Sequence, residues 1–189
     1  FDNVRKNFGC GCMRLKMGGD KVEYKESKKM IDAFLDAGFN YFDTAHGYID
    51  GKSETAIRDC LAARYPRESY LLANKLSGPF FNTEEEIRPL FEKELEACGV
   101  EYFDFYLLHN LTREQIELTE QKGGFDFIKK LKKEGKVKHI GFSTHDNAAA
   151  LDALLERHPE VEFVQLQINY LDWDNDMVQS RKCYEVARK

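Results

Sequence analysis

The chain has 189 residues, which is enough for one domain with a hydrophobic core. Apolar residues make up 42% of the chain and charged residues 32%, and the formal net charge is -5. Its short basic runs lie beside acidic residues, so they do not form the uncompensated basic stripe typical of nucleic-acid binding. No apolar run reaches the ~18–20 residues of a membrane span. We therefore expect neither a nucleic acid nor a membrane as partner.

The five cysteines are odd in number and scattered in spacing. The Cys10-x-Cys12 pair is not a CxxC motif, and no second pair completes a zinc site. Reduced thiols are typical of a cytoplasmic protein, so we expect that compartment and no metal.

Short β-rich runs alternate along the chain with longer amphipathic patterns. The expected strands are residues 7–13, 40–43, 70–75, 103–108, 137–143 and 163–168. The expected helices lie near residues 28–37, 53–65, 83–98, 125–134 and 147–157, and a sixth runs to the end of the chain. Residues 110–124 are expected to form a long loop. This alternation predicts βαβ units and therefore a parallel sheet.

Two architectures fit such a pattern, an open doubly wound sheet and a closed β/α barrel. An open sheet that binds a dinucleotide is expected to carry G-x-G-x-x-G at its first strand–helix turn. The first turn here reads Gly9-Cys-Gly11-Cys-Met-Arg14, with no third glycine in place. The sequence therefore favours the parallel (β/α)8 barrel of the triosephosphate isomerase (TIM) type.

Five of the expected strands carry polar or ionisable residues at or next to their carboxyl ends. The strand-terminal residues are Asp43, Lys75, His109 and Ser143, and the last strand carries Gln165 and Gln167. In a β/α barrel the carboxyl ends of the strands face one shared mouth, where active sites are built. We expect these side chains to meet there, together with Tyr48, which lies five residues beyond Asp43.

These residue types suit the protonation of a carbonyl oxygen. A free tyrosine has a pKa of about 10, and a neighbouring ammonium favours its phenolate form. A buried lysine keeps its charge when an aspartate pairs with it. We therefore predict Tyr48 as the acid, Lys75 and Asp43 as the ion pair beside it, and His109 as the group that orients the carbonyl.

Several segments, in the right order, resemble the aldo-keto reductase family. They are GCGCMRL at 9–15, NYFDTAHGY at 40–48, ANK at 73–75, DFYLLH at 104–109, GKVKHIGFS at 135–143, and VQ at 164–165 followed by NY at 169–170. The resemblance implies an NADPH-dependent oxidoreductase that interconverts a carbonyl compound and an alcohol. Tyr48 is then the general acid in reduction and the base in oxidation.

The resemblance also implies a cofactor site. Ser143 and Gln165 correspond to residues that hydrogen-bond the nicotinamide carboxamide, and Asp43 borders the same ring. Met13 and Arg14 belong to the segment that passes under the nicotinamide. Thr144 stands where the family commonly has asparagine, and it is included as a cofactor contact.

The resemblance covers about six of the eight β/α units of a complete barrel, whose typical length is ~250 residues. We expect residues 1–189 to form a single reductase-like domain that lacks units seven and eight. The two open sheet edges are potential sites of self-association. We also expect this piece alone to bind NADPH poorly.

Two alternatives use the same scaffold. A barrel metallohydrolase could draw its ligands from Asp43, His46, His109 and His145, with Lys75 beside them. A non-catalytic, NADPH-binding regulatory subunit, of the kind that potassium channels use, is the second alternative.

Overall fold

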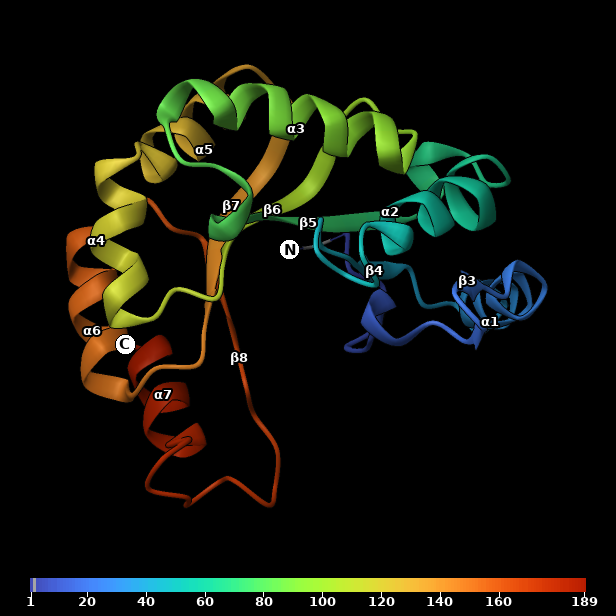
Figure 1. The fold of residues 1–189 in the computed structure, drawn as a ribbon. Helices are drawn as coiled ribbons and strands as arrows, with labels where there is room; N and C mark the ends of the chain where they lie inside the picture. The colour runs from blue at the N-terminus through green and yellow to red at the C-terminus, as the bar shows by residue number, and fades with distance from the viewer. Residues whose placement is uncertain (2) are drawn as a thin grey trace.

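The computed structural model describes residues 1 and 3–189. Within them, parallel strands form one curved sheet in the order β1-β4-β5-β6-β7-β8 (Figure 1). The strands are β1 (Gly9–Gly11), β4 (Tyr41–Asp43), β5 (Leu71–Ser77), β6 (Phe103–His109), β7 (Val137–Thr144) and β8 (Phe163–Leu166). The sheet curls into part of a barrel, which is the architecture that the sequence favoured over an open sheet.

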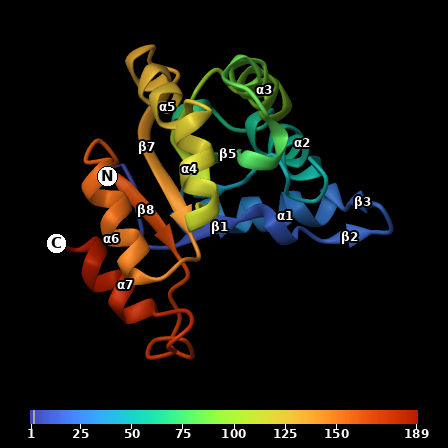
Figure 2. The same cartoon turned by 60° about the vertical axis from the view of Figure 1, so that its left-hand side comes forward.

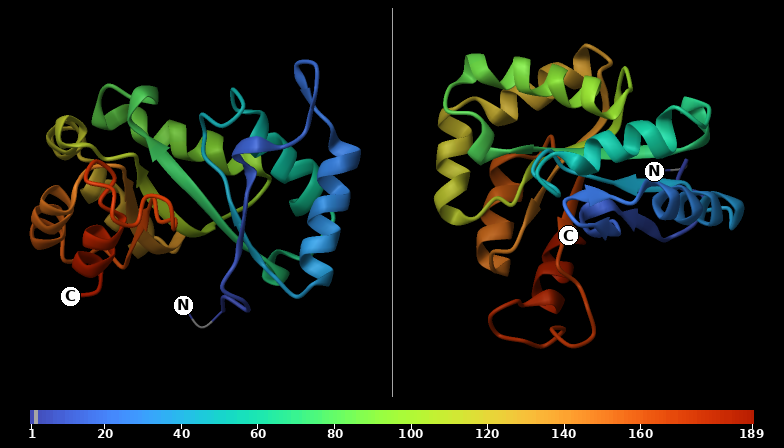
Figure 3. Two further views of the ribbon diagram at one scale, coloured as in Figure 1. Left: turned by 90° about the horizontal axis from the view of Figure 1, so that it is seen from below. Right: turned by 45° about the vertical axis from the view of Figure 1, so that its right-hand side comes forward.

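The helices lie on the convex side of the sheet (Figures 2 and 3). They are α1 (Tyr24–Asp36), α2 (Lys52–Ile57), α3 (Glu84–Cys98), α4 (Arg113–Gln121), α5 (Gly124–Lys133), α6 (Ala148–Arg157) and α7 (Ser180–Ala187). Helix α2 continues into a π-helical turn, Arg58–Ala62. None of these helices is long and apolar enough to cross a bilayer.

The prediction of a loop after His109 was wrong. Residues Arg113–Gln121 form α4, which buries Ile116 and Thr119 on one face. This helix has few apolar residues of its own, so its stability depends on packing against the neighbouring helix α5 rather than on a strong local pattern. A small hairpin, β2 (Met17–Gly18) with β3 (Lys21–Val22), was also not anticipated.

Alternation along the strands separates two faces of the sheet. Side chains at even positions, such as Phe42, Leu72 and Phe142, belong to the main core between the sheet and the helices. Side chains at odd positions, such as Leu71 and Phe105, form a second cluster on the concave face. All five cysteines are buried and free. The odd positions thus form the inner lining of the barrel.

Candidate active site

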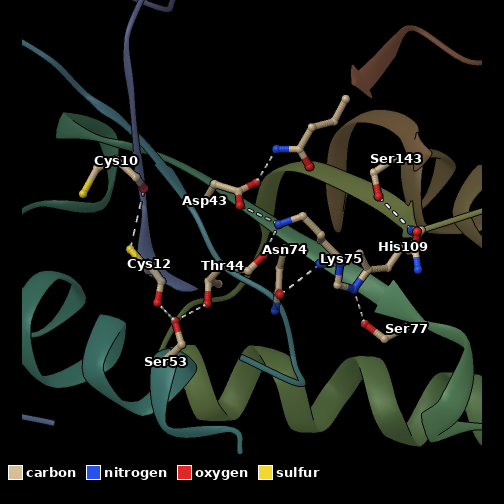
Figure 4. Close-up of polar contacts among 12 residues, drawn as sticks. Cys10, Cys12, Asp43, Thr44, Ser53, Asn74, Lys75, Ser77, His109 and Ser143 are labelled. Carbon is tan, nitrogen blue, oxygen red and sulfur yellow. Dashed lines mark hydrogen bonds and ion pairs between the residues drawn. The ribbon is translucent and has the colours of Figure 1, made fainter. Parts of the chain in front are cut away.

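The concave lining changes from apolar to polar toward the carboxyl ends of the strands. Lys75 pairs in register with Leu107, Ser77 with His109, and Ser143 with Gln165. The side chains of these residues lie on the concave face of the sheet. They are closer to the carboxyl ends of the strands than the apolar cluster that contains Phe105. The structure therefore brings the predicted strand-terminal side chains to one end of the sheet (Figure 4).

A buried ion pair occupies the centre of this site. The ammonium of Lys75, a residue only 1% exposed, lies 2.5 Å from Oδ1 of Asp43 and donates a second hydrogen bond of 2.8 Å to the carbonyl of Thr44. The second oxygen of Asp43 accepts a 3.3 Å hydrogen bond from Gln165. A buried ammonium retains its charge when a carboxylate pairs with it, so Lys75 presents a fixed positive charge to the mouth.

Tyr48 lies on the loop that follows β4. The Lys75 ammonium lies over the face of its ring, 4.7 Å from the ring centroid. The next two residues, Ile49 and Asp50, both have a φ of 53°, which is uncommon for a β-branched side chain such as isoleucine. This tight turn returns the chain to α2 and holds Tyr48 half-buried at the mouth.

His109 ends β6 next to Tyr48. The two rings are 5.7 Å apart between centroids and meet edge to face at 79°. Burial, reinforced by the nearby charges of Lys75 and His145, lowers the pKa of His109 to about 4. The imidazole is therefore neutral near pH 7 and can donate a hydrogen bond from only one of its nitrogens.

Of the predicted cofactor contacts on β7 and β8, two have polar atoms at the mouth. The hydroxyl oxygen of Ser143 accepts a 2.8 Å hydrogen bond from the backbone N–H of Asn110. The hydroxyl proton of Ser143 remains available to donate. Gln165 uses its nitrogen on Asp43, so its amide oxygen remains as an acceptor. Thr144 differs, because its hydroxyl already donates to the carbonyl of Leu111 at 2.6 Å.

The remaining predicted contacts follow β1. Met13 is 52% exposed and Arg14 is also exposed, in a short 3-10 turn. Ser53 anchors this turn by donating a 2.9 Å hydrogen bond to the carbonyl of Cys12. Thr44 bonds to the same serine at 2.7 Å, which fixes the turn beside the end of β4.

The three histidines of the metallohydrolase alternative bond to different partners. His46 pairs with Glu54 at 2.9 Å, and His145 contacts the amide oxygen of Gln167 at 3.1 Å. In the described residues, the group whose potential ligand atoms lie together is His46, Glu54 and Glu94. Burial and the charge of Glu54 raise the pKa of Glu94 well above its usual range, which disfavours its charged form.

Two polar residues near the site, Asn74 and Ser77, were not predicted as site residues from the sequence. Asn74 links β5 to α2 through a 2.8 Å hydrogen bond to Glu54. Ser77 lies 2.7 Å from Nδ1 of His109. The period of two along β5 places Ser77 on the same face as Lys75, and that spacing was the signal available for it.

The fold is part of a β/α barrel, with polar and ionisable side chains gathered at the carboxyl ends of its strands. The family model for the aldo/keto reductase family matches residues 7–189, and the chain belongs to that family.

Individual relatives agree with this assignment. The chain is 29% identical over 178 residues to a probable aldo-keto reductase 1 of Glycine max, and the match covers 89% of this chain and 49% of that one. It is 28% identical over 162 residues to the NADH-specific methylglyoxal reductase of Escherichia coli, covering 75% and 48% of the two chains. The chain thus spans about half the length of these relatives.

Solved structures share the fold. An aldo-keto reductase from Klebsiella pneumoniae, in complex with NADPH, superposes with a TM-score of 0.68 at 21% identity, covering 95% of this chain and 60% of the other. A putative aldo-keto reductase from Pseudomonas aeruginosa gives a TM-score of 0.77 at 20% identity, covering 95% and 68%.

Proposed function

We propose that this chain carries the catalytic part of a carbonyl reductase that uses a reduced nicotinamide cofactor. The observation that supports this best is the convergence of Tyr48, the Lys75–Asp43 ion pair and His109 at one end of the sheet. A phenol, a fixed ammonium and a neutral imidazole are the groups needed to bind a carbonyl oxygen and protonate it.

The polar atoms at the mouth fit a nicotinamide carboxamide. A primary carboxamide offers an acceptor oxygen and donor protons, and the site offers the hydroxyl proton of Ser143 and the amide oxygen of Gln165 in return. Met13 and Arg14 form the exposed floor on the β1 side. We assign no cofactor contact to the hydroxyl of Thr144, since Leu111 already accepts its proton.

When bound, the reduced cofactor supplies the hydride that reaches the carbonyl carbon. The residues of this chain manage the oxygen. His109 donates a hydrogen bond that orients the carbonyl, and Tyr48 gives its phenolic proton to the oxygen as negative charge develops there. The ammonium of Lys75 stabilises the resulting phenolate, while Asp43 keeps that ammonium charged. Solvent then returns a proton to Tyr48.

We propose NADPH as the cofactor, on the basis of the family resemblance. The Klebsiella structure contains NADPH, whereas the Escherichia coli relative is described as NADH-specific. Titrating the chain with each cofactor separately, and following the fluorescence of the reduced nicotinamide, distinguishes the two. Tighter binding of NADH would overturn this choice.

Replacement of Tyr48 tests the reaction itself. Tyr48→Phe keeps the ring over Lys75 but removes the proton donor, so the rate of methylglyoxal or benzaldehyde reduction should fall by roughly 100-fold or more. Tyr170→Phe is the matched control, because it removes the same phenolic hydroxyl from a side chain that is 92% exposed. Undiminished reduction by Tyr48→Phe would contradict the proposed acid.

A further inference from the structure

Ser77 contacts His109 but takes no part in the proposed transfer of hydride and proton. They are register partners on β5 and β6, and the serine oxygen lies 2.7 Å from Nδ1 of the imidazole. Ser77 is only 4% exposed. Figure 4 shows its hydroxyl directed at His109 from the side opposite Ser143. The contact is therefore a buried, short hydrogen bond between strands.

The direction of this hydrogen bond follows from the partners available. A neutral imidazole has one N–H and one bare nitrogen, and a serine hydroxyl has one proton to donate. In the described part of the chain, Ser77 has no other acceptor for its proton than Nδ1 of His109. If Nδ1 carried the imidazole proton, the buried hydroxyl would be left without an acceptor, at a cost of about 1–3 kcal/mol.

The other nitrogen of His109 faces the mouth. Among the described residues it has no hydrogen-bond partner, and it does not belong to the buried atoms that lack one, so solvent or a ligand reaches it. A proton fixed on this nitrogen is therefore a donor directed at the site.

We propose that Ser77 is a positioning residue that selects the Nε2–H tautomer of His109, and so makes this imidazole a hydrogen-bond donor to the substrate carbonyl. Without the serine, the two neutral tautomers of a histidine compete, and the Nδ1–H form presents a lone pair to the carbonyl oxygen. That arrangement repels the oxygen. The benefit to the reaction rests on the proposed function. The choice of tautomer rests only on the contact between Ser77 and His109.

The charged groups around the imidazole favour a neutral ring. Lys75 on β5 and His145 after β7 both disfavour a second positive charge, and burial lowers the pKa of His109 to about 4. Tyr48, from the loop after β4, faces the same ring. Because the ring stays neutral from pH 5 upward, its tautomer rather than its charge decides whether it donates.

Nitrogen-15 NMR of the imidazole tests the tautomer directly. In the 189-residue chain, the couplings from ring protons should identify His109 as the Nε2–H form. Ser77→Ala removes the donor, and both tautomers should then be populated. Ser77→Thr restores the hydroxyl on a residue that strands favour, and it should restore the single tautomer.

Ser27→Ala is a suitable control. Ser27 is 3% exposed and its hydroxyl has no partner, but it lies on α1 and does not contact His109. Its replacement removes a buried hydroxyl and should leave the His109 signals unchanged.

Kinetics provide the second measurement. Ser77→Ala should lower kcat/KM for an aldehyde by roughly 2- to 10-fold, the value of one hydrogen bond, while Ser77→Thr should recover most of it. An unchanged tautomer in Ser77→Ala, or an Nδ1–H form in the original chain, would overturn the proposal. A confirmed tautomer without any aldehyde reduction at saturating reduced cofactor would instead contradict the proposed function and leave the role of Ser77 in place.

Discussion

Each end of the sheet holds a buried aspartate, and the two aspartates differ in their hydrogen-bond partners. At the amino end, Asp104 accepts hydrogen bonds from Arg67 at 2.6 Å, Lys138 at 2.8 Å and the amide of Leu72 at 2.9 Å. At the carboxyl end, Asp43 bonds to Lys75 and Gln165. The first cluster joins protein groups to one another, whereas the second lies beside Ser143 and His109 at the mouth.

This difference separates a structural site from a chemical one. The hydrogen bonds of Asp104 come from other groups of the protein, so this cluster fixes the amino end of the sheet. At the mouth, the hydroxyl of Ser143 and Nε2 of His109 keep capacity for further hydrogen bonds. In β/α barrels the amino end generally serves stability and the carboxyl end catalysis.

Replacing the lysine at the mouth should have the largest effect. Lys75→Met removes the charge that stabilises a Tyr48 phenolate, so kcat/KM for aldehyde reduction should fall by roughly 100- to 1,000-fold. Steady-state assays with NADPH measure this loss. Circular dichroism at the assay temperature must show a folded chain, and a folded Lys75→Met variant with normal turnover would break the comparison.

Replacing the arginine at the amino end should act on stability instead. Arg67→Met leaves the buried carboxylate of Asp104 with Lys138 and the backbone amide of Leu72, which should lower the free energy of unfolding by about 3 kcal/mol. Urea titration measures this change. Turnover per folded molecule should stay within a factor of about two, since Arg67 lies at the opposite end of the strands. A loss of turnover comparable to that of Lys75→Met would show that the two ends are not independent.

A smaller effect is expected from pH. His109 has a pKa of about 4 in the folded chain and ~6.5 when unfolded, so the unfolded chain binds its proton first as the pH falls. Above pH 6.5, His109 therefore causes no loss in the free energy of unfolding. As the pH falls to about 4, the loss should grow to roughly 2 kcal/mol, allowing for solvent screening of the half-buried ring. His109→Asn should remove this part of the dependence in urea titrations between pH 4 and 7. Identical slopes for both chains would refute it.

The sequence predicted the parallel sheet and the convergence of Asp43, Lys75 and His109. Both follow because the carboxyl ends of parallel strands lie at the same edge of the sheet. It did not reveal the Ser77–His109 contact, whose partners are 32 residues apart and meet only through strand register. The helix α4 was missed for a related reason. Its few apolar residues, among them Ile116, give a weak local pattern, and tertiary packing supplies the rest.

The hydrogen bond between Gln165 and Asp43 spans 122 residues of sequence. Contacts of such separation form late, because the chain must first close a long loop around ordered intermediate strands. The carboxylate can pair with Lys75 from the neighbouring strand well before β8 arrives. During synthesis, the Lys75–Asp43 pair can therefore form before β8 emerges, and the side of the pocket that would receive the carboxamide is completed only after Gln165 has emerged.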